Sequence, residues 1–338
     1  MVTLSVLDQT PIRSGGTAAQ AIEETLVLAQ ATERMGYHRY WLAEHHGTEG
    51  LAGCSPEILI ARVADLTSTI RVGSGGVMLS HYSPLKVAEN FALLSTMYPG
   101  RIDVGLGRAP GGDQLTTIGM AYGSKIGVEY YPTKVLDLKA FLTGSEPANA
   151  ALAQVKVTPV PPVPPELWLL GSSEESAKLA AQFGLPYSFA HFIYPDGAEA
   201  MLDTYRNAWQ ASDTLSAPKA NMCVGVICAE TQEEAEYLAL SRKLWRLQLA
   251  KGALGPYPTP EEAKHYKYTD RERLVADSAN KTGIVGDPQA VKEGLERLAQ
   301  CCGLEEIMVV TITHDFNARI RSYELLADIF DLSAKNAS

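Results

Sequence analysis

Four short apolar stretches of this chain end directly in small, polar or charged residues of the kinds that bind ligands. Two of them end in Glu44–His46 and in Gly73–Gly76, and the other two end in Gly105–Arg108 and in Gly171–Ser173. In a parallel β-barrel the carboxyl ends of all strands open on the same face, where active sites are built. The four stretches together therefore predict one composite site.

Arg108 and the segment Gly171–Ser173 are candidates for binding a phosphate group. A guanidinium forks onto phosphate oxygens, and the hydroxyl and backbone N–H groups of the serines, with Ser176 one turn into the next helix, suit an anion. Taken alone, Arg108 could equally pair with a surface carboxylate, and the serines more ordinarily cap a helix. Adjacent strands carry the two features, so they can meet on one ligand.

The glycines between Gly105 and Gly112 follow a strand, as glycines do in dinucleotide-binding folds. Their spacing is one residue too long for that fingerprint, and no helical pattern begins there, which excludes a Rossmann fold. Glycines at a strand end still let the backbone approach a flat or phosphorylated ligand closely.

The adjacent His45 and His46 suggest a metal site at first. Neighbouring residues on an extended segment point in opposite directions, however, and cannot easily share one ion. A single histidine at a pocket wall is better suited to proton transfer or to a hydrogen bond with a ligand ring. A buried histidine without a chemical role is the alternative. We therefore expect no metal site.

The elements that must position these residues alternate between strands and helices along the chain. Apolar runs predict eight strands, at residues 4–7, 40–43, 70–79, 102–104, 167–170, 187–190, 222–229 and 306–311, with helical patterns between them. Residues 109–127 show no clear period and predict a long loop over the site, and residues 251–282 predict a second insertion. We expect one α/β domain over residues 1–338, a (β/α)8 TIM barrel with insertions after strands four and seven.

Composition sets limits on the partners and the location of the chain. Of its 338 residues, 46% are hydrophobic, enough to fill the core of one such barrel. The formal net charge of -10 argues against nucleic acid or an anionic membrane as a partner. The sequence shows no apolar run of about 18 residues and no signal-peptide pattern. Five cysteines without a Cys-x-x-Cys pair indicate reduced thiols in a cytoplasmic protein.

Several segments resemble the bacterial luciferase-like flavin monooxygenase family in sequence, order and spacing. They are Ser5–Ile12, Trp41–His46, Val72–Leu79, Gly100–Gly111 and Trp168–Ser173, and the similarity continues to Arg321–Ala327. Each motif alone is moderately specific, whereas their order and spacing together are strongly so. The chain is most similar to the single-chain bacterial branch of unassigned substrate. The resemblance implies a TIM barrel that holds reduced FMN at its open face.

The resemblance also assigns roles to individual residues. It implies a cis peptide bond between Gly75 and Gly76 under the flavin ring, and a catalytic role for His45 with His46 beside it. The cofactor-binding residues that it implies, together with the glycines at the strand ends, are Gly75, Gly76, Gly107, Arg108, Gly171, Ser172, Ser173 and Ser176. A reactive cysteine of the luciferase catalytic chain falls on Gly107, so no thiol acts at this position.

By resemblance, the chain is a monooxygenase that uses reduced FMN, supplied by a separate flavin reductase, and dioxygen to oxidise a small organic substrate. His45 would act as the general acid or base. Relatives commonly form homodimers through helices that fall here at about residues 55–66 and 84–97. Two alternatives stay open: hydride transfer with a deazaflavin in the same fold, and a flavin-binding protein with little turnover. The candidate pocket residues are mostly apolar or aromatic and leave the substrate unidentified: Leu7, Met78, His81, Tyr82, Phe189, His191 and Phe192.

Overall fold

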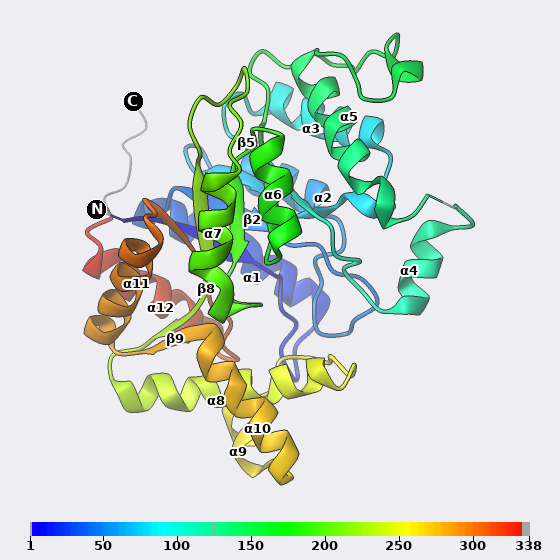
Figure 1. Ribbon diagram of the computed structural model, residues 1–338. Helices are drawn as coiled ribbons and strands as arrows, with labels where there is room; N and C mark the ends of the chain where they lie inside the picture. The colour runs from blue at the N-terminus through cyan, green and yellow to red at the C-terminus, as the bar shows by residue number, and fades with distance from the viewer. Residues whose placement is uncertain (1, 125, 333–338) are drawn as a thin grey trace.

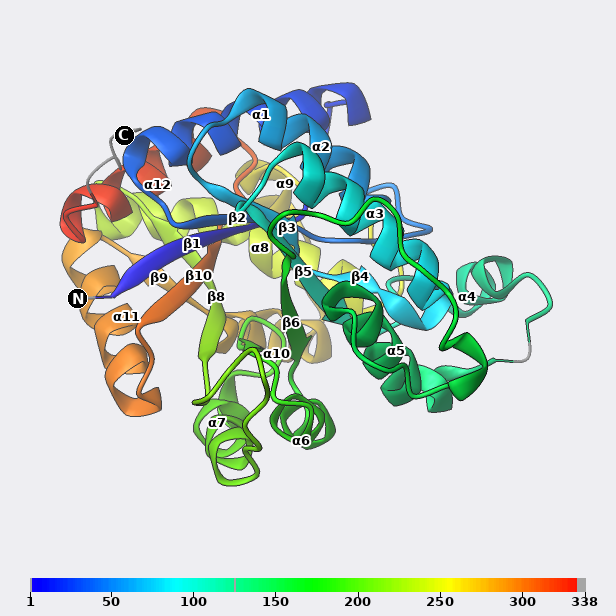
Figure 2. The same cartoon turned by 90° about the horizontal axis from the view of Figure 1, so that it is seen from above.

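The computed structural model describes residues 2–124 and 126–332 and contains a closed barrel of eight parallel strands (Figures 1 and 2). Positions 1, 125 and 333–338 of the predicted domain lie outside the described residues. The barrel strands are β1 (Thr3–Asp8), β2 (Arg39–Leu42), β3 (Arg71–Ser74), β5 (Ile102–Gly107), β6 (Glu166–Gly171), β7 (Tyr187–Ala190), β8 (Ala220–Cys228) and β10 (Glu306–Val310). Pairing of β10 with both β1 and β8 closes the ring. The predicted TIM barrel is therefore confirmed.

Two short strands widen the sheet beyond the eight barrel strands. The strand β4 (Val77–Met78) continues the segment after β3 and pairs with the end of β5. The strand β9 (Gly283–Gly286), which the sequence analysis does not predict, pairs with the second half of β8 from Gly225 onward. The first half of β8 pairs with β10 instead, up to the pair of Gly225 with Val310. One edge of β8 therefore pairs with β10 and then with β9, while its other edge pairs with β7.

Helices surround the barrel on its outer side (Figure 2). They are α1 (Ala18–Met35), α2 (Pro56–Leu66), α3 (Pro84–Met97), α5 (Tyr131–Thr143), α6 (Glu174–Gln182), α7 (Ala198–Asn207), α8 (Gln232–Ala250), α11 (Pro288–Cys302) and α12 (Phe316–Ile329). Thr17 caps α1 with a capping box, and the left-handed Gly36 ends the helix. Ser55 and Ser83 occupy the N-cap positions of α2 and α3, but neither forms a side-chain cap bond with a described residue. None of the described helices is both long and apolar enough to cross a bilayer.

The segment 109–127 contains a helix, α4 (Gln114–Ala121), so the prediction of a continuous loop is wrong there. Asp113 caps α4 by accepting a hydrogen bond from the N–H of Thr116 at 2.7 Å. None of the eight helical residues is buried, which explains why the sequence carries no apolar period at this point. In Figure 1, α4 projects away from the barrel. Position 125 of this segment lies outside the described residues.

The segment 251–282 contains two further helices, α9 (Pro260–His265) and α10 (Asp270–Ser278), which pack against α8. Single 3-10 turns occur at η1 (Leu79–His81), η2 (Val128–Tyr130), η3 (Ala150–Leu152), η4 (Pro195–Gly197) and η5 (Ala279–Thr282).

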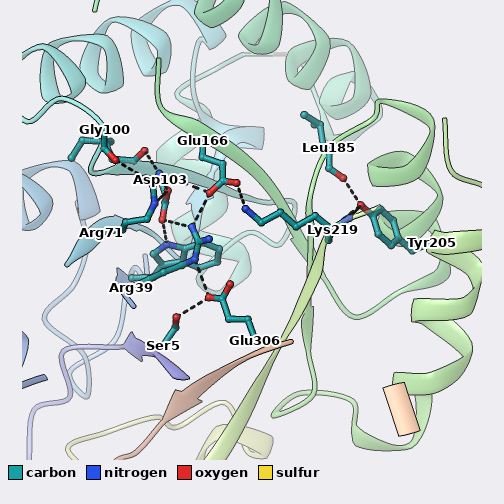
Figure 3. A network of polar contacts seen from close by, with 12 residues as sticks. Ser5, Arg39, Arg71, Gly100, Asp103, Glu166, Leu185, Tyr205, Lys219 and Glu306 are labelled. Carbon is teal, nitrogen blue, oxygen red and sulfur yellow. Dashed lines mark hydrogen bonds and ion pairs between the residues drawn. The ribbon is translucent and has the colours of Figure 1, made fainter. Parts of the chain in front are cut away.

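A network of buried charges occupies the amino end of the barrel, opposite the carboxyl ends of the strands (Figure 3). The guanidinium of Arg39 bonds Asp103 at 2.9 Å, Glu166 at 2.8 Å and Glu306 at 2.9 Å. Burial opposes the charge of Arg39, but these three carboxylates outweigh it and raise its pKa. Burial likewise opposes the charge of Glu166, yet Arg39 and Lys219 lower its pKa to about 2. The network closes the floor of the barrel, so a ligand must enter from the other end.

Candidate active site

A cavity of about 300 Å³ opens at the carboxyl end of the barrel. Its floor includes Trp41, whose ring packs edge-to-face on Trp168 and whose Nε1 donates to Asp103 at 2.9 Å. The predicted site residues on its walls are His45, Gly75, Gly76, Gly107, Arg108, Gly171, Ser172, Ser173 and Ser176. The structure thus brings the ends of four strands together around one cavity, and of the predicted catalytic and cofactor-binding residues only His46 does not line it.

Glycines form one wall of the cavity because side chains would not fit there. The peptide bond between Gly75 and Gly76 is cis, as the resemblance implies. A Cβ at Gly75 would lie 2.5 Å from Cδ1 of Leu7, and a Cβ at Gly76 would lie 2.7 Å from the carbonyl oxygen of Gly105. Beside them, a Cβ at Gly107 would lie 3.1 Å from Sδ of Met78. The wall therefore presents bare backbone to whatever occupies the cavity.

Cationic and polar donors gather at the ends of β5 and β6. Arg108 forms an ion pair with Glu175 of α6, and both side chains are substantially exposed, so the pair is weak. Ser173 caps α6 by accepting from the N–H of Ser176 at 3.3 Å, and the Ser176 hydroxyl donates back to the Ser173 carbonyl at 2.7 Å. These are the surface pairing and the capping that the sequence also allows. The amino end of α6 nevertheless faces the cavity with Arg108 beside it, which suits an anion.

His45 places its imidazole in the cavity wall. Its Nδ1 is buried and has no hydrogen-bond partner among the residues that the model describes. Burial, reinforced by the neighbouring His46, lowers the pKa of His45 to about 4. The ring is therefore neutral near pH 7 and holds one proton that it can share with a bound ligand.

His46 turns away from the cavity, as expected for the neighbour of His45 on an extended segment. Its Nε2 lies 2.7 Å from Oε1 of Glu44, a fully buried carboxylate. Glu44 also accepts the Tyr82 hydroxyl at 2.7 Å and the backbone N–H of Met78 at 3.0 Å. Glu44 thereby connects the end of β2 to β4 and holds two walls of the cavity in place.

Sequence reasoning noticed Glu44 only as a possible ligand, and missed other residues of the cavity. The missed residues are Gln9, Ser188, Ala190, Ile193, Cys223 and Met308. Of the predicted pocket residues, Leu7, Met78 and Phe192 line the cavity, whereas His81 and Tyr82 line a neighbouring cleft of about 710 Å³ beside α4. Phe189 and His191 are buried and line neither. Within residues 2–124 and 126–332, no group of three or more His, Cys, Asp or Glu side chains is placed to hold a metal ion.

Comparisons with known proteins agree with this fold. The family model for luciferase-like monooxygenases matches residues 2–304. The uncharacterized protein YceB of Bacillus subtilis is 44% identical over 98% of this chain and 100% of its own length. The N-acetyl-S-alkylcysteine monooxygenase of the same organism is 38% identical over 97% of this chain and 98% of its own length. The crystal structure of apo-MsnO8 superposes with a TM-score of 0.90 at 39% identity, covering 99% of both chains. The chain belongs to the luciferase-like monooxygenase family, which confirms the resemblance seen in the sequence.

More distant structures share the barrel but carry different cofactors. The oxygenating constituent of 3,6-diketocamphane monooxygenase from Pseudomonas putida, in complex with FMN, has a TM-score of 0.72 at 20% identity, and the superposition covers 97% of both chains. An F420-dependent secondary alcohol dehydrogenase has a TM-score of 0.72 at 15% identity and covers 99% of both chains. At these identities the likeness shows the fold alone, so the choice of cofactor must be argued from the site.

Proposed function

We propose that this chain is a flavin-dependent monooxygenase that uses reduced FMN and dioxygen to oxidise a small organic substrate. The observation that carries the proposal is the composition of the cavity. One space of about 300 Å³ combines a bare glycine wall, a group of anion-binding donors and a buried neutral histidine. The N-acetyl-S-alkylcysteine monooxygenase, at 38% identity over nearly the whole chain, supports the same class of reaction.

The residues of the site fit a flavin mononucleotide. Arg108, Ser172 and Ser173 would hold the phosphate at the amino end of α6, where a positive charge, hydroxyls and the helix dipole act together. Gly75 and Gly76 would lie against the flat ring, because both line the cavity with backbone alone. The bound reduced flavin supplies the electrons and the activation of dioxygen.

The protein's own contribution is to position the reactants, exclude water and hold a proton. Leu7, Trp41 and Met308 give the cavity an apolar floor that keeps water from the reacting groups. Neutral His45, which lines the cavity, would hydrogen-bond the substrate or the oxygen being transferred. Glu44 acts indirectly, because its hydrogen bonds keep the segment beside His45 in place.

A separate reductase would supply the reduced flavin. A flavin-dependent trigonelline monooxygenase of Acinetobacter baylyi, 21% identical over 83% of this chain, is named as an oxygenase component and supports this partnership. We also propose a homodimer formed through α2 and α3, because these helices expose the apolar side chains of Ile58, Leu93 and Met97. A cytoplasmic location agrees with the five cysteines, all of which are free thiols.

Rapid mixing of anaerobic protein and photoreduced FMN with oxygenated buffer tests the proposal. We expect the protein to change the rate at which reduced FMN is reoxidised, and an isotopic label from dioxygen to enter an N-acetyl-S-alkylcysteine or another organic substrate. Reoxidation at the rate of free FMN, with no label in any product, would contradict it. Reduction of a substrate by a reduced deazaflavin without oxygen consumption would establish the hydride-transfer alternative, and tight flavin binding without turnover would establish the flavin-binding alternative.

A further inference from the structure

A second, smaller cavity of about 50 Å³ lies beside the main one, where β8 leaves its pairing with β10 and begins to pair with β9. Its walls are mostly apolar, with Val226, Val310 and Ile312 among them. Two arginines of α8, Arg242 and Arg246, also line it. Positive charge in an apolar cavity requires an explanation.

The guanidinium group of Arg242 packs against the paired strands β8 and β9. Its Nη2 donates to the Thr282 hydroxyl at 2.8 Å. Gly225 of β8 and Gly283 of β9 are paired directly, and a Cβ at Gly225 would lie 2.6 Å from Nη2, while a Cβ at Gly283 would lie still closer to Nη1. Glycine at both positions therefore leaves the space that the guanidinium occupies. Arg246 is fixed separately, through a hydrogen bond from its Nη1 to the Phe192 carbonyl at 3.1 Å.

Arg242 and Arg246 are both partly buried, and neither has a carboxylate partner among residues 2–124 and 126–332, in contrast to the fully buried Arg39 and Arg319. Arg39 pairs with three carboxylates, and Arg319 pairs with Asp8 at 2.7 Å. Burial lowers the pKa of Arg242 to about 10, with Tyr257 opposing the shift and Arg246 adding to it. Burying a cation without a counter-charge is costly. An anion that entered between the two guanidinium groups would remove that cost.

The size and position of the small cavity define the anion. A volume of about 50 Å³ has room for about three or four water-sized groups, which matches a carboxylate and is far too small for a flavin. Gln9 and Phe192 line both this cavity and the main one, so the two spaces adjoin. A small molecule in the main cavity that reaches past Gln9 and Phe192 would bring an acid group to Arg242 and Arg246.

We infer that Arg242 and Arg246 bind a carboxylate group of the organic substrate, so that the substrate is a small organic acid oxidised at a position remote from its carboxylate. Forked donors of two arginines suit the planar, two-oxygen shape of that group. The identity of the bound acid as a substrate rests on the proposed function, whereas its binding does not require flavin.

Calorimetric titration of the flavin-free protein with hexanoate and with its neutral counterpart hexanamide tests the inference. We expect hexanoate to bind and hexanamide to bind at least tenfold more weakly. Arg242→Gln and Arg246→Gln should each weaken hexanoate binding roughly ten- to hundredfold, the loss of a charge-assisted pair. Arg297→Gln, on the exposed surface of α11, is the matched control and should leave the affinity unchanged.

Three results would overturn the inference: equal affinity for acid and amide, unchanged hexanoate affinity in a folded Arg246→Gln protein, or inorganic phosphate binding more tightly than hexanoate at these arginines. Arg246 makes a single hydrogen bond among the described residues, so its variant keeps the test available if Arg242→Gln fails to fold. Because the titration contains neither flavin nor oxygen, its failure is separate from a failure of the monooxygenase proposal, which the oxygen experiment decides.

Discussion

Oε1 of Glu44, which lines the cavity, lies 2.7 Å from Nε2 of His46, which does not line it. The next residue along the chain from Glu44, His45, also lines the cavity. Two adjacent histidines therefore have different surroundings: one ring is fixed by a buried carboxylate, and the other is left with an unpartnered nitrogen among the described residues.

Replacing Glu44 with Gln should lower the free energy of unfolding by about 1–3 kcal/mol. The buried carboxylate accepts three hydrogen bonds, and the amide would replace one of its oxygens with an N–H donor that faces other donors. Tyr82→Phe removes only one of these bonds and should cost about 1 kcal/mol. Urea unfolding of the two variants measures both effects. Equal stability of Glu44→Gln and the parent protein would show that the cluster contributes nothing.

The lowered pKa of His45 predicts acid sensitivity of the fold. Between about pH 6.5 and pH 4 the unfolded chain binds a proton at this histidine and the folded chain does not, so stability falls as the pH falls. The slope contributed is at most about 1.4 kcal/mol per pH unit. Denaturant unfolding across this range should show a shallower pH dependence for His45→Gln. His265→Gln, on an exposed side chain of α9, should retain the parent slope.

The same residue should matter for turnover more than for cofactor affinity. His45→Ala is expected to reduce turnover by about 10²- to 10⁴-fold, the usual contribution of a positioned proton-transfer group. FMN affinity should stay nearly unchanged, because the phosphate and ring contacts proposed here come from other residues. Loss of FMN binding with unchanged turnover per bound flavin would assign His45 to binding instead.

Arg108 should distinguish FMN from riboflavin, which lacks the phosphate. Arg108→Gln is expected to weaken FMN binding roughly ten- to hundredfold and leave riboflavin binding unchanged, as measured by flavin fluorescence quenching. Glu175→Gln removes the carboxylate that now pairs with Arg108 and should strengthen FMN binding or leave it unaltered. Equal losses for both flavins in Arg108→Gln would place the phosphate elsewhere.

Gly76→Ala should disrupt the glycine wall, because its Cβ would lie 2.7 Å from a backbone oxygen that cannot move away easily. We expect a lower melting temperature and weaker FMN binding. Gly119→Ala in α4 is the control: a Cβ there meets no heavy atom within 4 Å, and alanine favours the helix by about 0.5–1 kcal/mol. A Gly76→Ala protein with parent stability and parent FMN affinity would refute the close-approach explanation.

The strands could be predicted from the sequence because each is a buried apolar run that ends in a change of composition. The positions of His45, Gly75, Arg108 and Ser173 around one cavity follow from that pattern, since parallel strands present their carboxyl ends together. The strand β9 could not be predicted, because four residues bounded by glycines carry too little apolar signal. Helix α4 could not be predicted either, because it buries no side chain and therefore needs no apolar helical period.

Contacts between residues that lie far apart in the sequence could not be predicted, because no local sequence pattern encodes them. Arg39 and Glu306 are 267 positions apart, and nothing near either residue indicates that they meet at the barrel floor. The same holds for Arg242, whose guanidinium group occupies the space left by glycines of two strands. The sequence analysis noted neither Arg39 nor Arg242, because a charged residue is ordinarily solvated and only the packed structure shows otherwise.

Different parts of β8 close the barrel and shape its rim, because one edge of the strand pairs first with β10 and then with β9. Residues 222–225 of β8 pair with β10 and complete the ring. Residues 225–228 of β8 pair instead with β9, the strand that follows the segment 251–282. Substitutions or length changes in that segment would thus remodel the entrance and leave the ring intact. A chain built in this way can acquire a new substrate preference while the structure of its barrel stays unchanged.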